Sequence, residues 1–207
     1  MTLHVLIPCK ALAAGKSRLA PMLDSSERTA LCTALLRRTL DCALELVPPE
    51  RCHLVSGDEA AAACASARQV RQIAEPPGSG LNPALEHARH MVCAGKVAPE
   101  LLILPIDLPF ASAIRLRSLV LVGGDVVVVP DRRGSGTNLL YLGATAAPCF
   151  DFRFGEASLA AHRAAAQECR LGFRLHEDAD LGFDLDLPED LRDWRAAVNA
   201  ARAPRRP

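Results

Sequence analysis

Three cationic side chains follow the first apolar stretch of the chain and together could hold an anion. Residues 3–7 form a largely apolar run of strand length, and Pro8 cannot continue a central strand. Lys10, Lys16 and Arg18 come next, in a segment rich in alanine and glycine. Cations in the loop that leaves the carboxyl end of a buried strand are a common means of binding phosphate in α/β proteins. A solvated turn explains any one of these cations alone, whereas three together favour an anion site.

Three aspartates could bind a metal ion that works with these cations. Asp107 follows the apolar run 101–105, and the end of such a strand is the ligand-binding edge of an open α/β sheet. Asp184 and Asp186 are two residues apart, so on an extended backbone both carboxylates point to one face. Mg²⁺ prefers carboxylates together with a substrate phosphate. A turn or cap role for Asp107 and a solvated face for the pair are the alternatives, and the basic cluster favours the metal site.

The segment Ala14 to Ser17 looks like the end of a phosphate-binding P-loop, G-x-x-x-x-G-K-[ST]. That pattern requires a glycine five residues before Gly15, and Lys10 stands there instead. Without this glycine the loop lacks its cradle of backbone amides. The sequence therefore argues against a P-loop.

Two further segments could contact an anionic ligand. A Gly-rich loop carries Thr137 and Asn138 and could bring backbone amides close to a ligand, although a hairpin loop explains it equally well. Gly155 and Ser158 lie at the predicted start of a helix, where free amides and the helix dipole favour an anion. His162 follows one turn after Ser158 on the same face, and an isolated histidine there is more often a packing residue than a catalyst.

The elements that must position these residues alternate between strands and helices. A capping box at Asp24 and Glu27 begins a helix that ends at Pro48, and Asn82 is the predicted cap of a helix with Pro83 at its first position. This alternation predicts an α/β fold with a mainly parallel sheet covered on both faces. One domain is expected over residues 1–207, with 203–207 a frayed tail. The predicted strands are 3–8, 52–56, 70–74, 101–105, 126–129 and 139–142.

Composition argues against several classes of protein, among them general nucleic-acid binders and membrane proteins. The chain has 207 residues, of which 50% are hydrophobic, and no net charge, which argues against a general nucleic-acid binder. It contains no run of roughly 18 uninterrupted apolar residues, so no membrane span is expected. Lys10 interrupts the first apolar run before it could act as a signal peptide. Eight cysteines without a C-x-x-C pair predict free thiols in a reduced, cytoplasmic protein without structural zinc.

An ordered series of short motifs spans nearly the whole chain, from Leu3 to Leu191. The motifs are Pro8-x-Lys10, Lys16-Ser17-Arg18-Leu19, Gly80-Leu81-Asn82, Pro105-x-Asp107-Leu108-Pro109, Pro130-Asp131, Gly136-Thr137-Asn138, Phe154-Gly155-x-x-Ser158, His162 and Asp184-x-Asp186-x-Pro188-x-Asp190-Leu191. Each motif is weak alone, but their order resembles that of the CofC/FbiD family, guanylyltransferases in the biosynthesis of the deazaflavin coenzyme F-420.

The resemblance implies a three-layer fold like that of the nucleotide-diphospho-sugar transferases. It also implies an enzyme that joins the GMP of GTP to a small phosphorylated carboxylic acid and releases pyrophosphate. The acceptors that it suggests are 2-phospho-L-lactate, phosphoenolpyruvate and 3-phospho-D-glycerate. A downstream phospholactate transferase would receive the product, and a homodimer is compatible with the resemblance.

The same resemblance implies roles for single residues. Asp107, Asp184 and Asp186 would hold the Mg²⁺ ions. Lys16, Arg18 and Asn82 would lie on the nucleotide side. The acceptor-side positions would be Lys10, Thr137, Gly155 and Ser158, and Asn138 beside Thr137 is expected to contact substrate. The chain departs from the family pattern at Gly15, where alanine is usual, at Pro83 and at Leu187, and none of these changes removes an expected ligand.

No general base is expected in this reaction, because an acceptor phosphate is already anionic near neutral pH. Two other functions stay open. Another nucleotidyltransferase of the same fold, acting on a sugar phosphate or the molybdenum cofactor, would typically have a Gly-rich loop where Pro8-Cys9-Lys10 stands. A nucleotide-binding regulatory module without turnover would not need three metal-binding aspartates.

Overall fold

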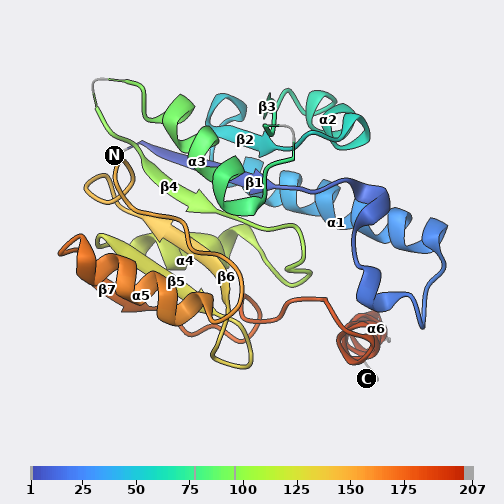
Figure 1. The fold of residues 1–207 in the computed structure, drawn as a ribbon. Coiled ribbons are helices and arrows are strands. Elements are labelled where there is room, and N and C mark those ends of the chain that lie inside the picture. The colour runs from blue at the N-terminus through green and yellow to red at the C-terminus, as the bar shows by residue number, and fades with distance from the viewer. Residues whose placement is uncertain (1, 77, 96, 203–207) are drawn as a thin grey trace.

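A computed structural model describes residues 2–76, 78–95 and 97–202, so the predicted frayed tail 203–207 lies outside the described residues. Seven strands form one sheet in the order β3-β2-β1-β4-β6-β5-β7 (Figure 1). In the described pairs, β6 runs antiparallel to β4 and β5, and all other neighbours are parallel. The prediction of a mainly parallel sheet is confirmed. The strands are β1 Leu3–Pro8, β2 Cys52–Val55, β3 Arg71–Ile73, β4 Glu100–Ile103, β5 Val126–Pro130, β6 Thr137–Leu142 and β7 Phe173–Leu175.

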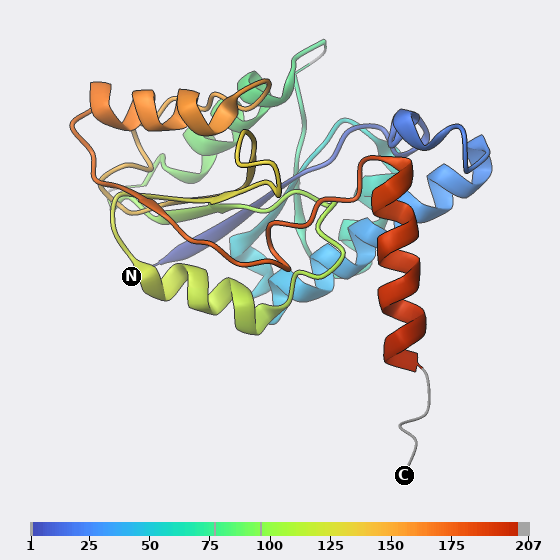
Figure 2. The ribbon, with the colours of Figure 1, turned by 90° about the horizontal axis from the view of Figure 1, so that it is seen from below.

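Helices cover both faces of this sheet and give three layers (Figure 2). Successive strand residues point to opposite faces, so Val5 and Ile7 pack in one core while Leu6 packs in the other. The first core includes residues of α1, α2 and α4, and the second includes residues of α3 and α5. The helices are α1 Ser25–Leu44, α2 Glu59–Ser66, α3 Leu81–Val92, α4 Ala113–Val122, α5 Ser158–Glu168 and α6 Pro188–Arg202.

The starts of two helices test the sequence-based predictions. The capping box of α1 is present, with the carboxylate of Asp24 accepting from the backbone N–H of Glu27. The prediction of Asn82 as the cap of α3 is wrong: Gly80 is the N-cap, and Asn82 is the second residue of the helix. The amide side chain of Asn82 is instead engaged with a distant segment, as described below.

The last helix, α6, stands beside the loop after β1 rather than on either face of the sheet (Figure 2). A small third core joins it to that loop through Leu19, Leu23, Phe183, Leu185 and Leu191. This core fixes the basic segment near the C-terminal aspartates. No helix in the described ranges is long and apolar enough to cross a membrane.

The strand β7 was not predicted from the sequence. It has three residues and lies at the edge of the sheet beside β5, and so short a segment gives no clear alternation of apolar and polar residues. All six predicted strands are present, and their ends differ from the predicted ends by at most two residues.

Candidate active site

The loops that follow β1 and β4 adjoin, because these two strands are neighbours in the sheet. Lys16 in the first loop and Asp107 in the second thereby form an ion pair, with 3.2 Å between Nζ and Oδ2. The same ammonium lies 2.7 Å from Oδ1 of Asp186. Arg18 lies at the edge of this cluster, 3.8 Å from the other carboxylate oxygen of Asp186. The structure therefore brings the predicted basic and acidic groups into one site.

The C-terminal segment 183–187 reaches this site by a backbone contact. The N–H of Leu185 donates to the carbonyl of Asp107 over 3.0 Å, while Phe183 and Leu185 are buried in the third core. The segment forms no strand. Because its side chains alternate, Asp184 and Asp186 both line the cavity described below.

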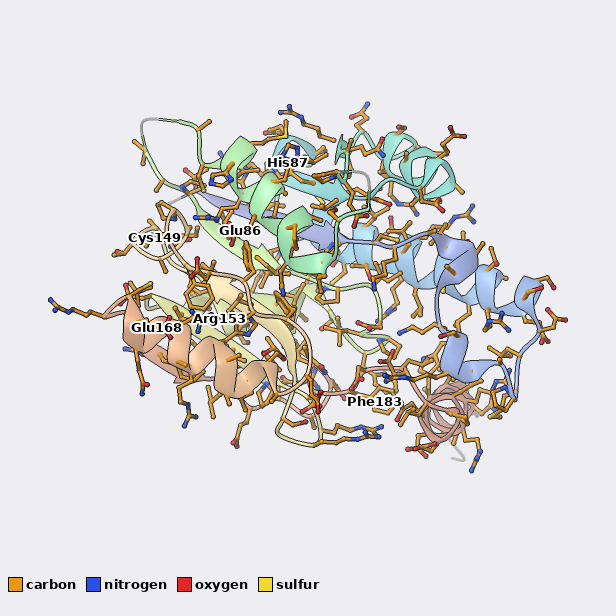
Figure 3. The ribbon with its side chains drawn as sticks, viewed as in Figure 1. Glu86, His87, Cys149, Arg153, Glu168 and Phe183 are labelled. Carbon is orange, nitrogen blue, oxygen red and sulfur yellow. The ribbon has the colours of Figure 1, made fainter. Side chains whose placement is uncertain are left out.

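The side chain of Asp190 holds the turn that leads into α6. Its Oδ2 accepts the backbone N–H groups of Asp186 and Leu187 over 2.9 and 2.7 Å, and its other oxygen pairs with Arg132. The guanidinium of Arg132 also lies over the ring of Phe183, 4.2 Å from its centroid. Figure 3 labels Phe183 next to α6. These contacts fix the backbone that carries Asp186.

Charge is unevenly balanced among the three aspartates. The Lys16 side chain is 8% exposed, and although burial opposes its charged form, Asp107 and Asp186 raise its pKa. Asp184 has no ion pair with a described lysine or arginine. Burial raises the pKa of Asp184, and the negative charges of Asp107, Asp186 and Asp190 add to the effect. Asp184 is thus the carboxylate that lacks a counter-charge.

A cavity of about 680 Å³ extends from these aspartates to the start of α5. Besides the three aspartates, its wall includes five residues that the sequence predicted as ligand contacts. The backbone before α5 is unusual, since Gly155 has a φ of +138° and Ala157 one of +52°. Glycine adopts such a conformation readily, and both residues line the cavity. The five residues are Arg18, Thr137, Asn138, Gly155 and Ser158.

The hydroxyl of Thr137 is oriented by His162, a residue that sequence reasoning treated as packing. His162 is fully buried, and its Nε2 accepts the backbone N–H of Arg153 over 3.0 Å. In a neutral imidazole the proton must then be on Nδ1, which lies 3.0 Å from Oγ1 of Thr137. Burial, with a smaller contribution from the charge of Arg153, lowers the pKa of His162 to about 4. The Thr137 oxygen therefore accepts from His162 and keeps its own hydrogen for a ligand.

Two residues of α3, one turn apart, hold the loop before α5 in place. Asn82 Nδ2 donates to the carbonyl of Phe154 over 2.9 Å, and its Oδ1 accepts the N–H of Phe154 over 2.8 Å. Glu86 accepts the N–H of Phe152 over 3.2 Å; Figure 3 labels Glu86 on α3 and Arg153 in this loop. The nucleotide-side role expected for Asn82 stays a prediction, and in the structure both ends of its amide bind the loop that carries Gly155.

A second, smaller cavity of about 310 Å³ lies on the other side of the aspartates. Asp107, Asp186, Leu81 and Pro105 line both cavities. Lys10 lines this smaller cavity and not the one that contains Thr137 and Ser158, because it directly follows β1, whose neighbours are β2 and β4. The structure thus does not bring Lys10 together with the other predicted acceptor-side residues.

Asn138 lines the larger cavity, but its side-chain amide is hydrogen-bonded within the protein. It is 7% exposed, and its Nδ2 donates to the carbonyl of Leu181 over 3.1 Å. Its amide thus ties β6 to the segment that leads to Asp184.

The donor set suits a hard divalent cation. Within residues 2–76, 78–95 and 97–202, no group of three or more His, Cys, Asp or Glu side chains is arranged as a finished metal site; the Lys16 ammonium lies between two of the carboxylates. Asp184, however, is half-buried without a cation beside it. Carboxylate oxygens beside a cavity that can also admit a phosphate are the ligands that Mg²⁺ uses.

Comparison with known proteins gives a consistent picture. The family model described as "Guanylyl transferase CofC like" matches residues 3–196. A phosphoenolpyruvate guanylyltransferase of Rubrobacter xylanophilus is 36% identical, over 100% of both chains. A 3-phospho-D-glycerate guanylyltransferase of Phenylobacterium zucineum is 35% identical, over 92% of this chain and 85% of the relative.

Among solved structures, a protein from Desulfovibrio desulfuricans described as a putative nucleotide-diphospho-sugar transferase superposes with a TM-score of 0.72. The match covers 99% of this chain and 91% of that one, at 18% identity. It confirms the predicted fold, and identity this low carries no information about substrates.

Proposed function

The chain belongs to the CofC-like guanylyltransferase family and is thus a nucleotidyltransferase, and we propose that it transfers GMP from GTP to the phosphate of a small phosphorylated carboxylic acid. One observation of the structure supports this most strongly: the Lys16–Asp107–Asp186 cluster lies where two cavities meet. A nucleotide in the smaller cavity and an acceptor in the larger one would bring their phosphates together at this cluster.

The reaction needs alignment and charge neutralisation. An oxygen of the acceptor phosphate attacks the α-phosphorus of GTP, a new P–O bond forms, and the bond to the β-phosphate oxygen breaks, so pyrophosphate leaves. The acceptor phosphate is already ionised near neutral pH, so no side chain has to remove a proton. Lys16, on the wall of the smaller cavity, and Arg18, on the wall of the larger one, would offset the negative charge of the triphosphate where the cavities meet. Holding two anions in line would account for much of the rate enhancement.

Magnesium is part of the proposal. Asp184, with Asp107 and Asp186, would hold Mg²⁺, which when bound polarises the α-phosphate and stabilises the leaving pyrophosphate. The counter-charge that Asp184 lacks in the protein alone supports this assignment.

The larger cavity offers two places for anionic groups of an acceptor. The Thr137 hydroxyl, directed by His162, can donate to one anionic group. The first turn of α5 offers the Ser158 hydroxyl and backbone amides to another, apart from the N–H of Leu159, which donates to the carbonyl of Ser135. Arg133 also lines this cavity and adds positive charge. A molecule with a phosphate and a carboxylate a few bonds apart matches this pair of sites.

The acceptor that we propose is one of three acids: 2-phospho-L-lactate, phosphoenolpyruvate or 3-phospho-D-glycerate. The names of the relatives from Rubrobacter xylanophilus and Phenylobacterium zucineum include two of them. We place the reaction in the biosynthesis of coenzyme F-420, in the cytoplasm, ahead of a phospholactate transferase that would consume the product. All eight cysteines are free thiols, as a reduced compartment requires.

A pyrophosphate-release assay tests this function. The purified protein with GTP and Mg²⁺ is offered the three acids in parallel with hexose 1-phosphates. We expect release with at least one acid and none with the sugars. Release with a hexose 1-phosphate alone would identify the rival transferase, and GTP binding without any release would identify the regulatory module.

A further inference from the structure

The smaller cavity contains a carboxylate that the proposed reaction does not use. Glu75 lies just beyond β3 and lines this cavity together with Asp107 and Asp186. Those two aspartates are paired with Lys16, whereas the hydrogen bond that Glu75 makes to a described residue is a long one, 3.5 Å from the Ser79 hydroxyl. The carboxylate of Glu75 is therefore available to a ligand.

The rest of the cavity wall has the character of a nucleoside site. Apart from the charged cluster it is lined mostly by apolar side chains, and its volume of about 310 Å³ suits a small organic group. The apolar lining residues include Pro8, Leu12, Val55, Leu81, Ala84 and Ile106. The weakly hydrated ring faces of a flat base would replace water on such a wall at little cost, because few polar groups of the wall would lose hydrogen bonds.

The position of Glu75, just beyond β3, indicates how a nucleotide would be oriented in the cavity. The strands lie in the order β3-β2-β1-β4, so Glu75 is at the β3 end while Asp107 follows β4. Three strand spacings correspond to about 14 Å, which is on the scale of a nucleotide. With the phosphates at Lys16 and Asp107, the base of the nucleotide extends towards Glu75.

The Cys9 thiol lines the same cavity as Glu75. Cys9 is 3% exposed. Burial, followed by the charge of Asp58 and smaller contributions that include Glu75, raises the pKa of Cys9 to about 12. The thiol stays neutral near pH 7 and does not compete for a donor on the base.

Guanine is the base that a carboxylate at this place selects. We propose that Glu75 accepts hydrogen bonds from the N1–H and the 2-amino group of guanine, which rests on the proposed function for the placement of GTP. An ionised carboxylate has acceptors alone, so it matches these two adjacent donors with a bidentate, charge-assisted pair. Adenine presents an acceptor, N1, beside its amino group, and hypoxanthine lacks the 2-amino donor.

The test compares GTP with ITP, whose base lacks the 2-amino group. We expect the wild-type kcat/KM to favour GTP over ITP by at least about tenfold, the usual effect of one hydrogen bond to a charged group. Glu75→Gln should bring this ratio close to one, mainly by lowering the value for GTP, while the KM of the acid acceptor stays unchanged. Glu59→Gln is the matched control, because Glu59 is exposed and lines a neighbouring surface depression with Glu75, so the same charge is removed nearby; it should keep the wild-type ratio.

Binding calorimetry separates this inference from the proposed reaction. If no acid supports turnover, the affinities of the wild type and of Glu75→Gln for GTP and ITP still report on the base. A wild type that binds GTP more tightly than ITP, with the preference lost in Glu75→Gln, supports the assignment. Equal affinity of the wild type for both nucleotides, or an unchanged preference in a folded Glu75→Gln variant, overturns it.

Discussion

The imidazole of His162 holds the hydroxyl of Thr137, with 3.0 Å between Nδ1 and Oγ1. The backbone N–H of Arg153 donates to the opposite ring nitrogen, so the tautomer is fixed and the Thr137 hydrogen is directed to the cavity. We expect His162→Phe to raise the KM of the acid acceptor about tenfold and to leave that of GTP nearly unchanged, since one oriented donor to an anion is lost. Steady-state kinetics with each substrate varied in turn measures this.

Thr137→Val and the double variant complete the test. If His162 acts through Thr137, the double variant should bind the acceptor no worse than Thr137→Val alone. Additive losses would show that His162 contributes by another route.

Acid should destabilise the folded protein through the same histidine. The pKa of His162 is lowered from its ordinary value of 6.5 to about 4, so the unfolded chain binds a proton at a pH where the folded chain does not. This stability is present above pH 6.5 and is lost as the pH falls towards 4. The Tm of the wild type should therefore fall more between pH 6.5 and 4 than that of His162→Gln, which cannot titrate there. Parallel Tm curves would contradict this.

Asp184→Asn should abolish turnover without weakening the fold. Asp184 has no described ion pair to lose, and the amide removes repulsion from Asp107, Asp186 and Asp190. We expect a loss of at least about 100-fold in kcat, a usual effect of removing one charge contact to a transition state, with a Tm equal to or above that of the wild type. Rates at saturating Mg²⁺ and thermal unfolding measure the two effects. A kcat near the wild-type value would rule out Asp184 as a metal ligand.

Substitutions of Lys16 and Arg18 should differ in their effects on the free energy of unfolding and on GTP binding. Lys16→Met leaves Asp107 and Asp186 without their partner, and since both carboxylates are partly exposed we expect a loss of about 1–3 kcal/mol in the free energy of unfolding. The Arg18 side chain is 71% exposed, so Arg18→Ala should leave stability unchanged while raising the KM of GTP. Urea denaturation and GTP titrations distinguish them. An unchanged GTP affinity in both variants would make the basic cluster a structural feature alone.

The glycine at position 15 is required by its neighbour. A Cβ atom there would lie 2.6 Å from Sγ of Cys32, which is 2% exposed. Gly15→Ala should therefore lower the free energy of unfolding by about 1–3 kcal/mol through overpacking, and Cys32→Ala in the same chain should restore part of it. Urea denaturation of the two single variants and the double variant checks this. Strictly additive losses would mean that the two sites do not interact.

The sequence predicted the strands and helices well because their apolar periodicity is local. It also placed Lys16 and Asp107 at strand ends, and the neighbouring positions of β1 and β4 bring them together. The hydrogen bonds of the Asn82 amide and the His162 imidazole were not predicted, since each depends on a contact that no local pattern encodes. Asn82 binds a loop 72 residues away, and His162 binds Thr137 across 25 residues.

Lys10 and Glu75 illustrate a second limit. Both line the smaller cavity. This cavity depends on the order β3-β2-β1-β4, which brings residues that follow different strands together. Sequence position alone could not tell which of the two cavities a strand-end residue faces, because that depends on the order of the strands in the sheet.

Label transfer from GTP tests the central claim most directly. The protein is incubated with Mg²⁺ and each of the three acids, using GTP labelled with ³²P at the α-phosphorus in one reaction and at the γ-phosphorus in another. Guanylyl transfer predicts the α-label in a new conjugate of GMP and the acid, and the γ-label in pyrophosphate. An α-label that stays in free nucleotides with every acid, or a γ-label that appears on the acid, would contradict the account.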